Sequence, residues 1–436
     1  MKRFDWESLS GQEIRSLCSR NILLDPEMVS LCRQIFDQVR ARGDDALREY
    51  TEKFDGVRLD DFRVTGDEMR RANQGLTPQQ AQALQDAASN IRTFHASQQV
   101  SEKVVEVGRG ITCWRASRAI SSVGLYVPAG TAPLPSTVLM LGIPAKLAGC
   151  ARIILAVPPR KDGTVAPEVL AAAHLIGLRQ VFKVGGAQAI AALALGTETI
   201  PRVDKILGPG SRLVQTAKLT ATFYGSWIDM VAGPTEVLII ADESAPADVV
   251  AADLISQAEH GGDSQCVLVT SSSKLADEAS REVEKQLETL PRRDLARQAL
   301  EKSFLLTTPS LEEAVQFSNQ YAPEHLILNV KNAREWLSRV ESAGSVFVGP
   351  WSPETAGDYA SGPNHTLPTS GLARCISGVS IDSFVKKITF QELSAEGLRS
   401  LAPTLEAMAS MEGLAGHDRA VKRRISRAAE MEGESE

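Results

Sequence analysis

The chain has 436 residues, which is long enough for two or three domains that each bury a hydrophobic core. Hydrophobic residues make up 43% of it and charged residues 23%, as in an ordinary soluble globular protein. The net charge is −7, and the one basic stretch, residues 419–427, has the spacing of a solvated helix face, so nucleic-acid binding is not expected. No apolar run reaches the roughly 18 residues of a membrane span, and the first residues are too polar for a signal peptide.

Six cysteines are scattered through the chain without any C-x-x-C pair. This usage predicts reduced, mostly buried thiols in a cytoplasmic protein. Cys150 and Cys266 lie in apolar stretches with no neighbouring base or cation, so a catalytic thiol is the weaker interpretation of either residue.

The first hundred residues have the periodicity of helices. Apolar side chains recur at helical spacing from Val29 to Val39. A second helix is predicted to begin at Pro78, with Thr77 as its N-cap and Gln80 as the capping-box partner.

From about residue 122, short apolar strands alternate with helices. This alternation is typical of parallel, doubly wound sheets, and it occurs in two series. The first series of predicted strands is 123–127, 153–157, 181–184, 205–207 and 227–230, and the second is 237–240, 266–270, 304–307, 326–330 and 345–348. Helices are expected between them, for example at 137–148 and 187–195. We therefore predict an α/β protein with two doubly wound Rossmann-like units and helical N- and C-terminal segments.

The pattern suggests four segments along the chain. We expect an N-terminal helical arm at 1–22 and a main α/β domain made of 23–125 and 234–378. Residues 126–233 would form an inserted Rossmann-like domain on the cofactor side, and 379–436 a C-terminal helical dimerisation segment.

Two glycine turns follow predicted strands, at 184–188 (VGGAQ) and 207–211 (LGPGS). Both could place backbone N–H groups near an anionic ligand at a helix N-terminus. There is no G-x-G-x-x-G fingerprint, so from these residues alone a tight strand–helix turn is the favoured interpretation of each.

The titratable side chains point to catalysis. Glu324 and His325 are adjacent at the start of a predicted strand, and four of the six histidines lie in a few polar clusters. Gln257 and His260 are three residues apart on a predicted helix and would share one face, as half of a metal site does. For this pair alone, solvent exposure is the better explanation, and it weakens once Asp358 and His417 are counted as possible third and fourth ligands. This concentration predicts an enzyme, and favours one that holds a metal.

Taken together, these segments resemble the L-histidinol dehydrogenase family over nearly the whole chain. The motifs are 54–56 (FDG), 124–128 (GLYVP), 184–188 (VGGAQ), 208–210 (GPG), 232–236 (AGPTE), 256–260 (SQAEH), 321–326 (YAPEHL), 357–362 (GDYASG), 364–365 (NH) and 412–417 (EGLAGH). The resemblance implies a homodimer with shared active sites and one zinc per subunit. It also implies oxidation of histidinol through histidinal to histidine with two NAD, the last steps of histidine biosynthesis.

The resemblance also implies roles for single residues. Glu324 and His325 would be the acid–base pair, with His325 as the base and Glu324 activating water for the second oxidation. The implied zinc ligands are Gln257, His260, Asp358 and His417. The implied NAD-site residues are Tyr126, Gln188 and Ser211. The implied substrate-site residues are Thr235, Gln257, His260, His325, Asp358, His365, Glu412 and His417.

Three residues depart from the family pattern. Thr235 stands where Ser is common, Ser211 where Asn is usual and Pro363 where Thr is usual. Related proteins oxidise other small alcohols, so a paralogue acting on another amino alcohol or diol is the main alternative. A non-catalytic metal-binding relative and a metallohydrolase are further ones. Glu412 favours an imidazole-bearing substrate, because its carboxylate can accept the ring N–H and would repel a sulfonate.

Overall fold

The computed structural model describes residues 1–20, 25–99, 101–129 and 132–433. These residues form two compact units, one made of 1–98 and 120–384 and the other of 99–119 and 385–436. The predicted fold class is confirmed, because the first unit contains two parallel sheets that alternate with helices. Among the described residues, no helix combines the length and the apolar character needed to cross a membrane.

The first unit begins with a strand and then a series of helices. In chain order these are β1 (Lys2–Asp5), η1 (Trp6–Ser8), α1 (Gly11–Cys18), α2 (Pro26–Arg42), α3 (Asp44–Asp55), α4 (Gly66–Gln74) and α5 (Pro78–Ala96). Helix α5 has the predicted capping box, in which the Thr77 hydroxyl accepts from the Gln80 N–H and the Gln80 side chain accepts from the Thr77 N–H.

The inserted sheet, as we call the parallel sheet of β4 to β8, follows in the chain. Its elements are β4 (Ser122–Tyr126), α6 (Pro135–Leu147), β5 (Arg152–Val157), α7 (Pro167–Leu175), β6 (Gln180–Lys183), α8 (Gly186–Leu195), β7 (Lys205–Leu207), α9 (Arg212–Thr222) and β8 (Trp227–Ile228). The strand order among the described residues is β6-β5-β4-β7-β8. The chain thus moves outward from β4 in both directions, as in one half of a Rossmann fold, and a topological switch point lies between β4 and β7.

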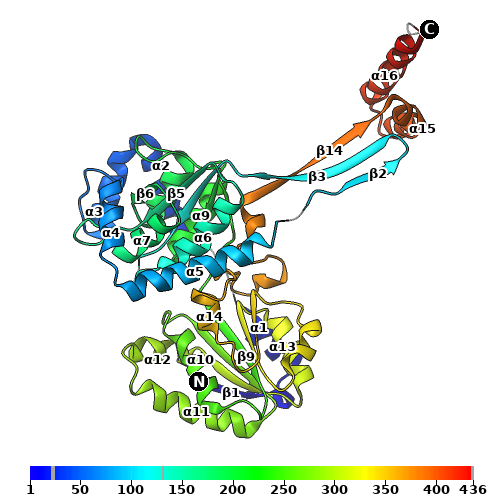
Figure 1. The fold of residues 1–436 in the computed structure, drawn as a ribbon. Helices are drawn as coiled ribbons and strands as arrows, with labels where there is room; N and C mark the ends of the chain where they lie inside the picture. Colours follow the sequence, from blue (N-terminus) through cyan, green and yellow to red (C-terminus); the bar gives the residue numbers. More distant parts are fainter. Residues whose placement is uncertain (21–24, 100, 130–131, 434–436) are drawn as a thin grey trace. The chain divides into compact units, whose positions relative to one another are not determined.

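The main sheet, the second parallel sheet of this unit, contains the N-terminal strand. Its further elements are β9 (Glu236–Ala241), α10 (Ala247–Ala258), β10 (Gln265–Thr270), α11 (Ser273–Leu287), α12 (Arg293–Glu301), β11 (Phe304–Thr307), α13 (Leu311–Tyr321), β12 (His325–Asn329), η2 (Ala333–Arg339), β13 (Ser345–Val348), α14 (Glu354–Tyr359), η3 (Leu372–Arg374) and η4 (Ile381–Phe384). The described strands lie in the order β1-β11-β10-β9-β12-β13. In Figure 1, α10, α11 and α12 cover one face and α1 and α13 the other.

The second unit is built differently. It contains β2 (Val104–Gly108), β3 (Ile111–Ala119), β14 (Val385–Leu393), α15 (Ala395–Met411) and α16 (Ala415–Gly433). Its described strands form an antiparallel ribbon in the order β14-β3-β2, with α15 and α16 beyond its end (Figure 1).

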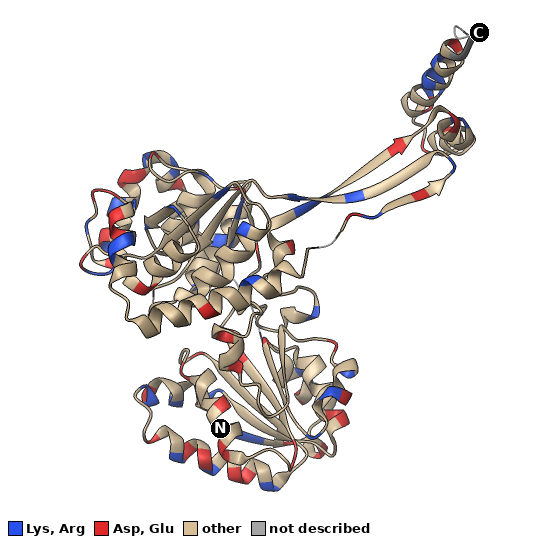
Figure 2. Ribbon diagram, in the orientation of Figure 1, with Lys and Arg blue, Asp and Glu red and all other residues tan. Residues whose placement is uncertain are grey.

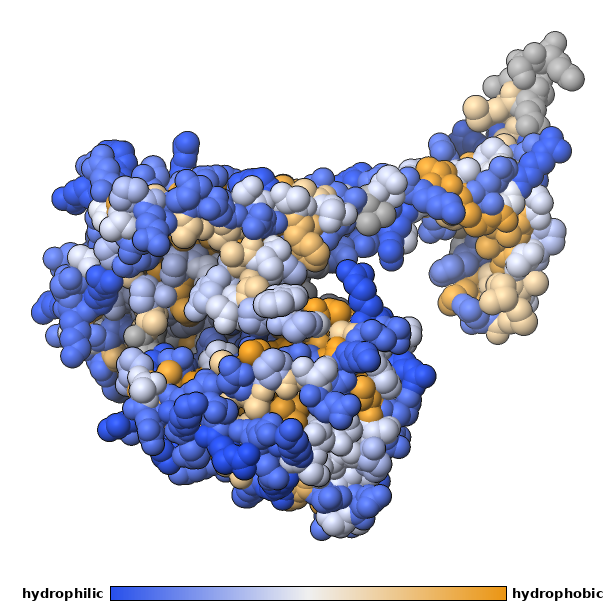
Figure 3. All heavy atoms as spheres, turned by 60° about the horizontal axis from the view of Figure 1, so that its bottom comes forward, coloured by the Kyte–Doolittle hydropathy of each residue, from blue (hydrophilic) through white to orange (hydrophobic). Residues whose placement is uncertain are grey.

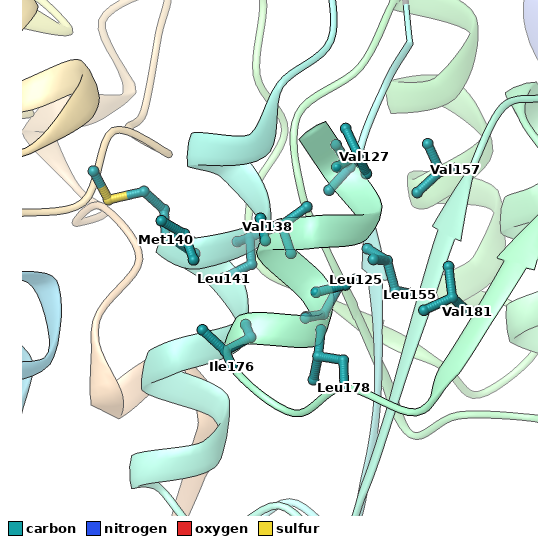
Figure 4. Close-up of a cluster of buried hydrophobic side chains, with 14 of the residues drawn as sticks. Leu125, Val127, Val138, Met140, Leu141, Leu155, Val157, Ile176, Leu178 and Val181 are labelled. Carbon is teal, nitrogen blue, oxygen red and sulfur yellow. The ribbon is translucent and has the colours of Figure 1, made fainter. Parts of the chain in front are cut away.

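Buried apolar side chains hold the inserted sheet to its helices. Figure 4 shows β4, β5 and β6 presenting Leu125, Leu155 and Val181 to side chains of α6, such as Val138 and Leu141. Each of these five is fully buried, and burial of such a side chain contributes roughly 1.5–3 kcal/mol. Outside these layers, Lys and Arg are interspersed with Asp and Glu along the outer helices (Figure 2).

The predicted strands match the observed ones closely, but the segment boundaries differ from the structure. Residues 2–5 form β1 rather than helix, and β1 pairs in parallel with β11. Helices α2 to α5 pack on the inserted sheet, not the main sheet, because their apolar faces share its two cores. Strand β4 also belongs to the inserted sheet. The expected boundary between residues 22 and 23 lies outside the described residues.

The expected C-terminal helical segment includes strand β14 at residues 385–393, which pairs with β3. Most side chains of β2 and β14 are exposed. Strands without a buried face show no alternation of apolar and polar residues, and the sequence therefore gave no sign of this ribbon.

Candidate active site

The candidate site lies at the amino ends of two neighbouring strands of the main sheet. Glu236 is the first residue of β9 and His325 the first of β12, and the two strands pair in parallel, with His325 opposite Val237. Helix α10 follows β9 and runs back along the sheet, so its C-terminal end, with Gln257 and then His260, returns to the same edge. Glu236, Gln257 and His260 therefore meet His325 at this edge, although they are far from it in the sequence.

A short hydrogen-bond chain joins Gln257 to Glu324. The Gln257 Nε2 donates to Thr235 Oγ1 at 2.9 Å, and the Thr235 hydroxyl donates to Glu324 Oε2 at 2.6 Å. The backbone N–H of Glu236 donates to the same carboxylate oxygen at 2.9 Å. Because the Gln257 amide nitrogen is used in this way, its Oε1 is left as a buried acceptor without a partner in the part of the chain that the structure describes.

The ring of His325 is oriented by its Nδ1. That atom lies 3.1 Å from the carbonyl oxygen of Glu236 and 3.4 Å from Glu354 Oε1. Both neighbours are acceptors, so Nδ1 carries the proton, and Nε2 is left as a free acceptor. Nε2 is buried without a hydrogen-bond partner among the described residues, 3.7 Å from Asp358 Oδ1. Burial lowers the pKa of His325 to about 3, so the ring is neutral and can accept a proton.

Three side chains come together as possible metal ligands. Ligand atoms of His260, Glu354 and Asp358 all lie within 4.8 Å of one another. Glu354 is 1% exposed, and neither of its carboxylate oxygens has a hydrogen-bond partner within the described chain. Burial, and then the charges of Asp358, Glu324 and Asp253, raise the pKa of Glu354 well above its ordinary value. A bound dication would remove that repulsion, and with the free Oε1 of Gln257 the donor set fits a metal such as zinc.

His365 is held at the edge of this cluster. Its Nδ1 lies 2.8 Å from the backbone oxygen of Asp358, and its Nε2 lies 3.0 Å from Thr137 Oγ1 at the start of α6. Thr137 therefore brings the first helix of the inserted sheet to the candidate site.

Backbone features place these residues. Helix α13 ends at Ala322, which adopts a left-handed conformation with φ 51° immediately before Pro323 and Glu324. On the other side, a Cβ at Gly344 would meet the backbone oxygen of Glu324 at 2.6 Å, so only glycine allows this approach. A Cβ at Gly357 would similarly lie 2.7 Å from the Phe347 ring. Glycine at 357 thus lets α14, with Glu354 and Asp358, lie against β13.

A buried ion pair supports the Glu324 segment from behind. The Arg20 guanidinium lies 3.4 Å from the centre of the Tyr321 ring and 3.3 Å from Glu236 Oε2. Glu236 Oε1 in turn accepts from the backbone N–H of Glu324 at 3.3 Å. Burial raises the pKa of Glu236 to about 7 despite the opposing effect of Arg20. This arrangement fixes the chain direction from which Glu324 and His325 project.

The three residues expected at the NAD site all lie at the carboxyl edge of the inserted sheet. The Tyr126 hydroxyl accepts from the backbone N–H of Gly186 at 3.1 Å, at the start of α8, where Gln188 also lies. Ser211 is the N-cap of α9, directly after the glycine turn that follows β7. This edge contains the topological switch point, where open α/β sheets bind ligands.

Glu412 and His417 belong to the second unit. Glu412 is the C-cap of α15 and His417 lies in the first turn of α16, and both are exposed on that unit. Their expected roles as substrate and metal residues stay a prediction.

The sequence analysis missed Glu354, Glu236, Arg20 and Thr137. Glu354 could have been found, because it precedes Asp358 by four residues and so lies on the same helical face. Arg20 could not, because nothing in the sequence indicates that it reaches Tyr321 and Glu236, some three hundred and two hundred residues away.

Comparison with known proteins shows the family to which this chain belongs. The family model described as histidinol dehydrogenase matches residues 19–425. The histidinol dehydrogenase of Photobacterium profundum is 47% identical over 435 residues, covering 99% of this chain and 97% of that one. The Escherichia coli (strain K12) protein of the same name is 48% identical over 425 residues, covering 97% of each.

A crystal structure of histidinol dehydrogenase from Elizabethkingia anophelis superimposes with a TM-score of 0.95 at 46% identity, covering 98% of this chain and 99% of that one. With a family model that matches nearly the whole chain, and relatives that share almost half of its residues, the chain belongs to the histidinol dehydrogenase family of oxidoreductases.

Proposed function

We propose that the protein catalyses the zinc-dependent oxidation of L-histidinol through histidinal to L-histidine with two NAD, in the last steps of histidine biosynthesis. The observation that carries this proposal is the orientation of His325. Its unprotonated Nε2 is buried, has no protein partner and faces Asp358 within a cluster suited to a metal. A base of this kind, beside a site that can fix an alcohol, is what the removal of a hydroxyl proton requires.

In the first oxidation, His325 Nε2 takes the hydroxyl proton of the substrate as the carbon loses a hydride to NAD. The carbonyl oxygen of Glu236 accepts from Nδ1–H, and the carboxylate of Glu354 lies 3.4 Å from Nδ1, so both stabilise the imidazolium that forms. The product of this step is the aldehyde, and its carbon must stay at the site for the second step.

In the second oxidation, Glu324 takes a proton from water as the water oxygen bonds to the aldehyde carbon. The proton that His325 holds from the first step passes to the aldehyde oxygen, which gives the hydrate and returns His325 to its neutral form. His325 then takes a hydroxyl proton of the hydrate as the second hydride leaves, which yields the carboxylic acid. Burial raises the pKa of Glu324 well above its ordinary value, with Thr235 and the Glu236 N–H acting in the opposite direction. A carboxylate with a raised pKa is a stronger base toward water.

Gln257 Oε1, His260 and Asp358 of one chain would hold the zinc, and Glu354 is a further carboxylate in reach of it. When bound, zinc would neutralise the buried carboxylates and fix the amine and imidazole of the substrate. The proposal predicts that His260→Asn lowers the zinc content more than Gln257→Ala, because a neutral amide is the weaker ligand. Full zinc occupancy in His260→Asn would contradict the assignment.

We propose that a second copy of the chain covers the second unit in a homodimer. Apolar side chains are exposed there, which Figure 3 shows as orange surface on this part of the chain. They include Val104, Val105, Val107, Met408, Met411 and Leu414. In such a dimer, Glu412 and His417 would enter the partner's site, with His417 as a zinc ligand and Glu412 accepting the ring N–H of the substrate.

A complementation experiment tests the shared site. A subunit with Glu324→Gln and His325→Ala, and a subunit with His417→Ala, should each be nearly inactive. Hetero-dimers of the two contain one intact site, so co-refolding should restore activity to roughly a quarter of wild type if chains pair at random. Proven hetero-dimers without activity would place His417 in its own chain's site.

The function itself is tested by following NADH production with histidinol, before and after removal of zinc by a chelator. We expect turnover that the chelator abolishes and added zinc restores. Turnover with a different amino alcohol or diol, but not with histidinol, would instead identify a paralogue.

The cytoplasmic location that we propose agrees with the six free cysteines.

A further inference from the structure

Beside the inserted sheet lies the carboxylate of Asp55, which the proposed mechanism does not use. Asp55 is the last residue of α3, and its Oδ2 lies 3.5 Å from the Nε2 of Gln188. Within the described residues this long contact is the one hydrogen bond that the Asp55 carboxylate accepts, although it is half-buried. A carboxylate can accept about four, so Asp55 keeps most of its acceptor capacity.

Through Gln188, Asp55 lies next to the turn that follows β6. Gln188 lies in the first turn of α8, after the turn that follows β6. That turn also touches the end of β5, because a Cβ at Gly185 would meet the Pro158 ring at 2.6 Å. With β4 as the first strand of this Rossmann half, β5 is the second. In such sheets, the acidic residue that binds the ribose hydroxyls of a dinucleotide lies near the end of the second strand.

The two ends of a dinucleotide can be assigned from this edge. Thr137, at the start of the helix after β4, contacts His365 of the candidate active site at 3.0 Å. Asp55 lies beside the turn after β6, and β6 is two strands from β4, the strand that precedes Thr137. Two strands correspond to roughly 10 Å at the usual strand spacing. The reacting ring belongs at the end near Thr137 and His365, so the adenosine half belongs at the end near Asp55.

We propose that Asp55 accepts hydrogen bonds from the adenosine ribose of the cofactor and makes the protein select NAD over NADP. This inference rests on the proposed NAD-dependent function and deepens it. A ribose diol supplies the donors that the carboxylate lacks, whereas the 2′-phosphate of NADP would bring negative charge against it. Burial raises the pKa of Asp55 to about 6, which still leaves the group ionised at neutral pH.

The test uses the zinc-loaded protein with Asp55→Asn, which keeps the size of the side chain, and with Asp60→Asn as the matched control. Asp60 is exposed and lies five residues further along the chain. Binding of NADH and NADPH is measured by fluorescence titration. We expect Asp55→Asn to weaken NADH binding by about tenfold or more and to reduce the preference for NADH over NADPH. Asp60→Asn should leave both quantities unchanged.

A double-variant cycle separates the ribose contact from a structural effect of Asp55. ADP and 2′-deoxy-ADP are compared as competitors of NADH on both proteins. The wild type should lose affinity for the deoxy compound, and Asp55→Asn should bind the two alike. If Asp55→Asn proves poorly folded by thermal unfolding, Asp55→Ser takes its place.

The outcomes distinguish the two proposals. A wild type that binds no NADH overturns the proposed function and this inference with it. A wild type that binds NADH, together with an Asp55→Asn variant whose NADH affinity and deoxy discrimination stay within twofold of wild type, overturns this inference alone.

Discussion

In the two sheets of the first unit, the candidate functional residues lie at opposite edges. The main sheet uses the amino ends of β9 and β12, together with the C-terminal end of α10 beside Gln257 and His260. The inserted sheet uses its carboxyl edge, with the N-terminal ends of α8 and α9. Helix C-termini favour cations and helix N-termini favour anions. The same alternation of strand and helix would therefore suit a metal at one edge and, as we propose, the phosphates of a cofactor at the other.

The side chains of the two edges differ accordingly. At the main sheet, Glu324, His325 and Glu354 are buried and their pKa values are strongly displaced by burial. At the inserted sheet, glycine turns bring backbone N–H groups to the edge, and Asp55 is the one carboxylate that contacts Gln188 among the described residues. We therefore expect proton transfer at the first edge and cofactor binding at the second, and substitutions should separate the two.

The largest effect is expected for His325→Ala. Removal of the base should lower turnover with both histidinol and histidinal by about a thousandfold or more, while NADH binding at the other edge stays normal. His174→Ala, at an exposed histidine of α7, is the control. Steady-state rates and NADH titration measure both quantities. A comparable loss of NADH affinity in His325→Ala would show that the two edges are not separate in function.

Glu324→Gln should divide the two oxidations. The amide cannot take a proton from water, so turnover of histidinal should fall about a hundredfold or more, and the histidinol-to-histidinal step should fall less. Single-turnover NADH formation from each substrate gives both rates. Equal losses on the two substrates would reject the assignment of water activation to Glu324.

Glu354→Gln should have an intermediate effect. The change keeps the shape of the side chain but removes the charge that faces His325 Nδ1 and the metal cluster. We expect turnover to fall about ten- to a hundredfold, with weaker zinc binding, as for other groups that support ligands. Zinc titration and rates measure this, with the exposed Glu335→Gln as control. If zinc affinity and turnover are unchanged in Glu354→Gln, Glu354 has no role in the site.

The sequence predicted most of the strands and helices that the spacing of apolar residues can reveal. The strands at 205–207, 304–307 and 345–348 were predicted with the observed bounds, because each is a short, mostly apolar run between turn residues. The packing of α2 to α5 on the inserted sheet was not predictable in this way. An amphipathic face such as that of Cys32, Ile35 and Phe36 shows that a helix is buried but does not identify the sheet that covers it.

The candidate site was likewise predicted in part. Glu324, His325, Gln257 and Asp358 were chosen from adjacency, spacing and resemblance, and the structure brings them to one edge. Glu354, by contrast, is defined by burial without a hydrogen-bond partner. Charged residues are mostly exposed in proteins, so the sequence alone does not reveal which of them is buried. Only the tertiary structure shows it.

A smaller effect is expected on stability at the metal edge. Burial raises the pKa of Asp253 to about 6. Its folded pKa is thus above its unfolded value, so its contribution to stability is present below about pH 4 and is lost as pH rises toward 6. Above pH 6, Asp253→Asn should stabilise the zinc-free protein by about 1–3 kcal/mol, and below pH 4 it should change little. Urea unfolding at both pH values tests this, with the exposed Asp86→Asn as control.

The smallest effect is expected for the cysteines, which separates this mechanism from one that uses a thiohemiacetal. Burial raises the pKa of Cys150 to about 11 and that of Cys266 further, so neither thiol is ionised near neutral pH. Cys266 is fully buried in the core of the main sheet between β10 and its helices, and is a packing residue there. Cys150→Ala and Cys266→Ala should each keep turnover within about threefold of wild type, with Cys266→Ala losing about 1 kcal/mol of stability from the lost sulfur atom. A thousandfold loss of histidinal oxidation in either variant, while its thermal unfolding stays close to wild type, would mean that a thiol attacks the aldehyde. The division between a catalytic edge of carboxylates and imidazoles and a binding edge of glycine turns would then be incomplete.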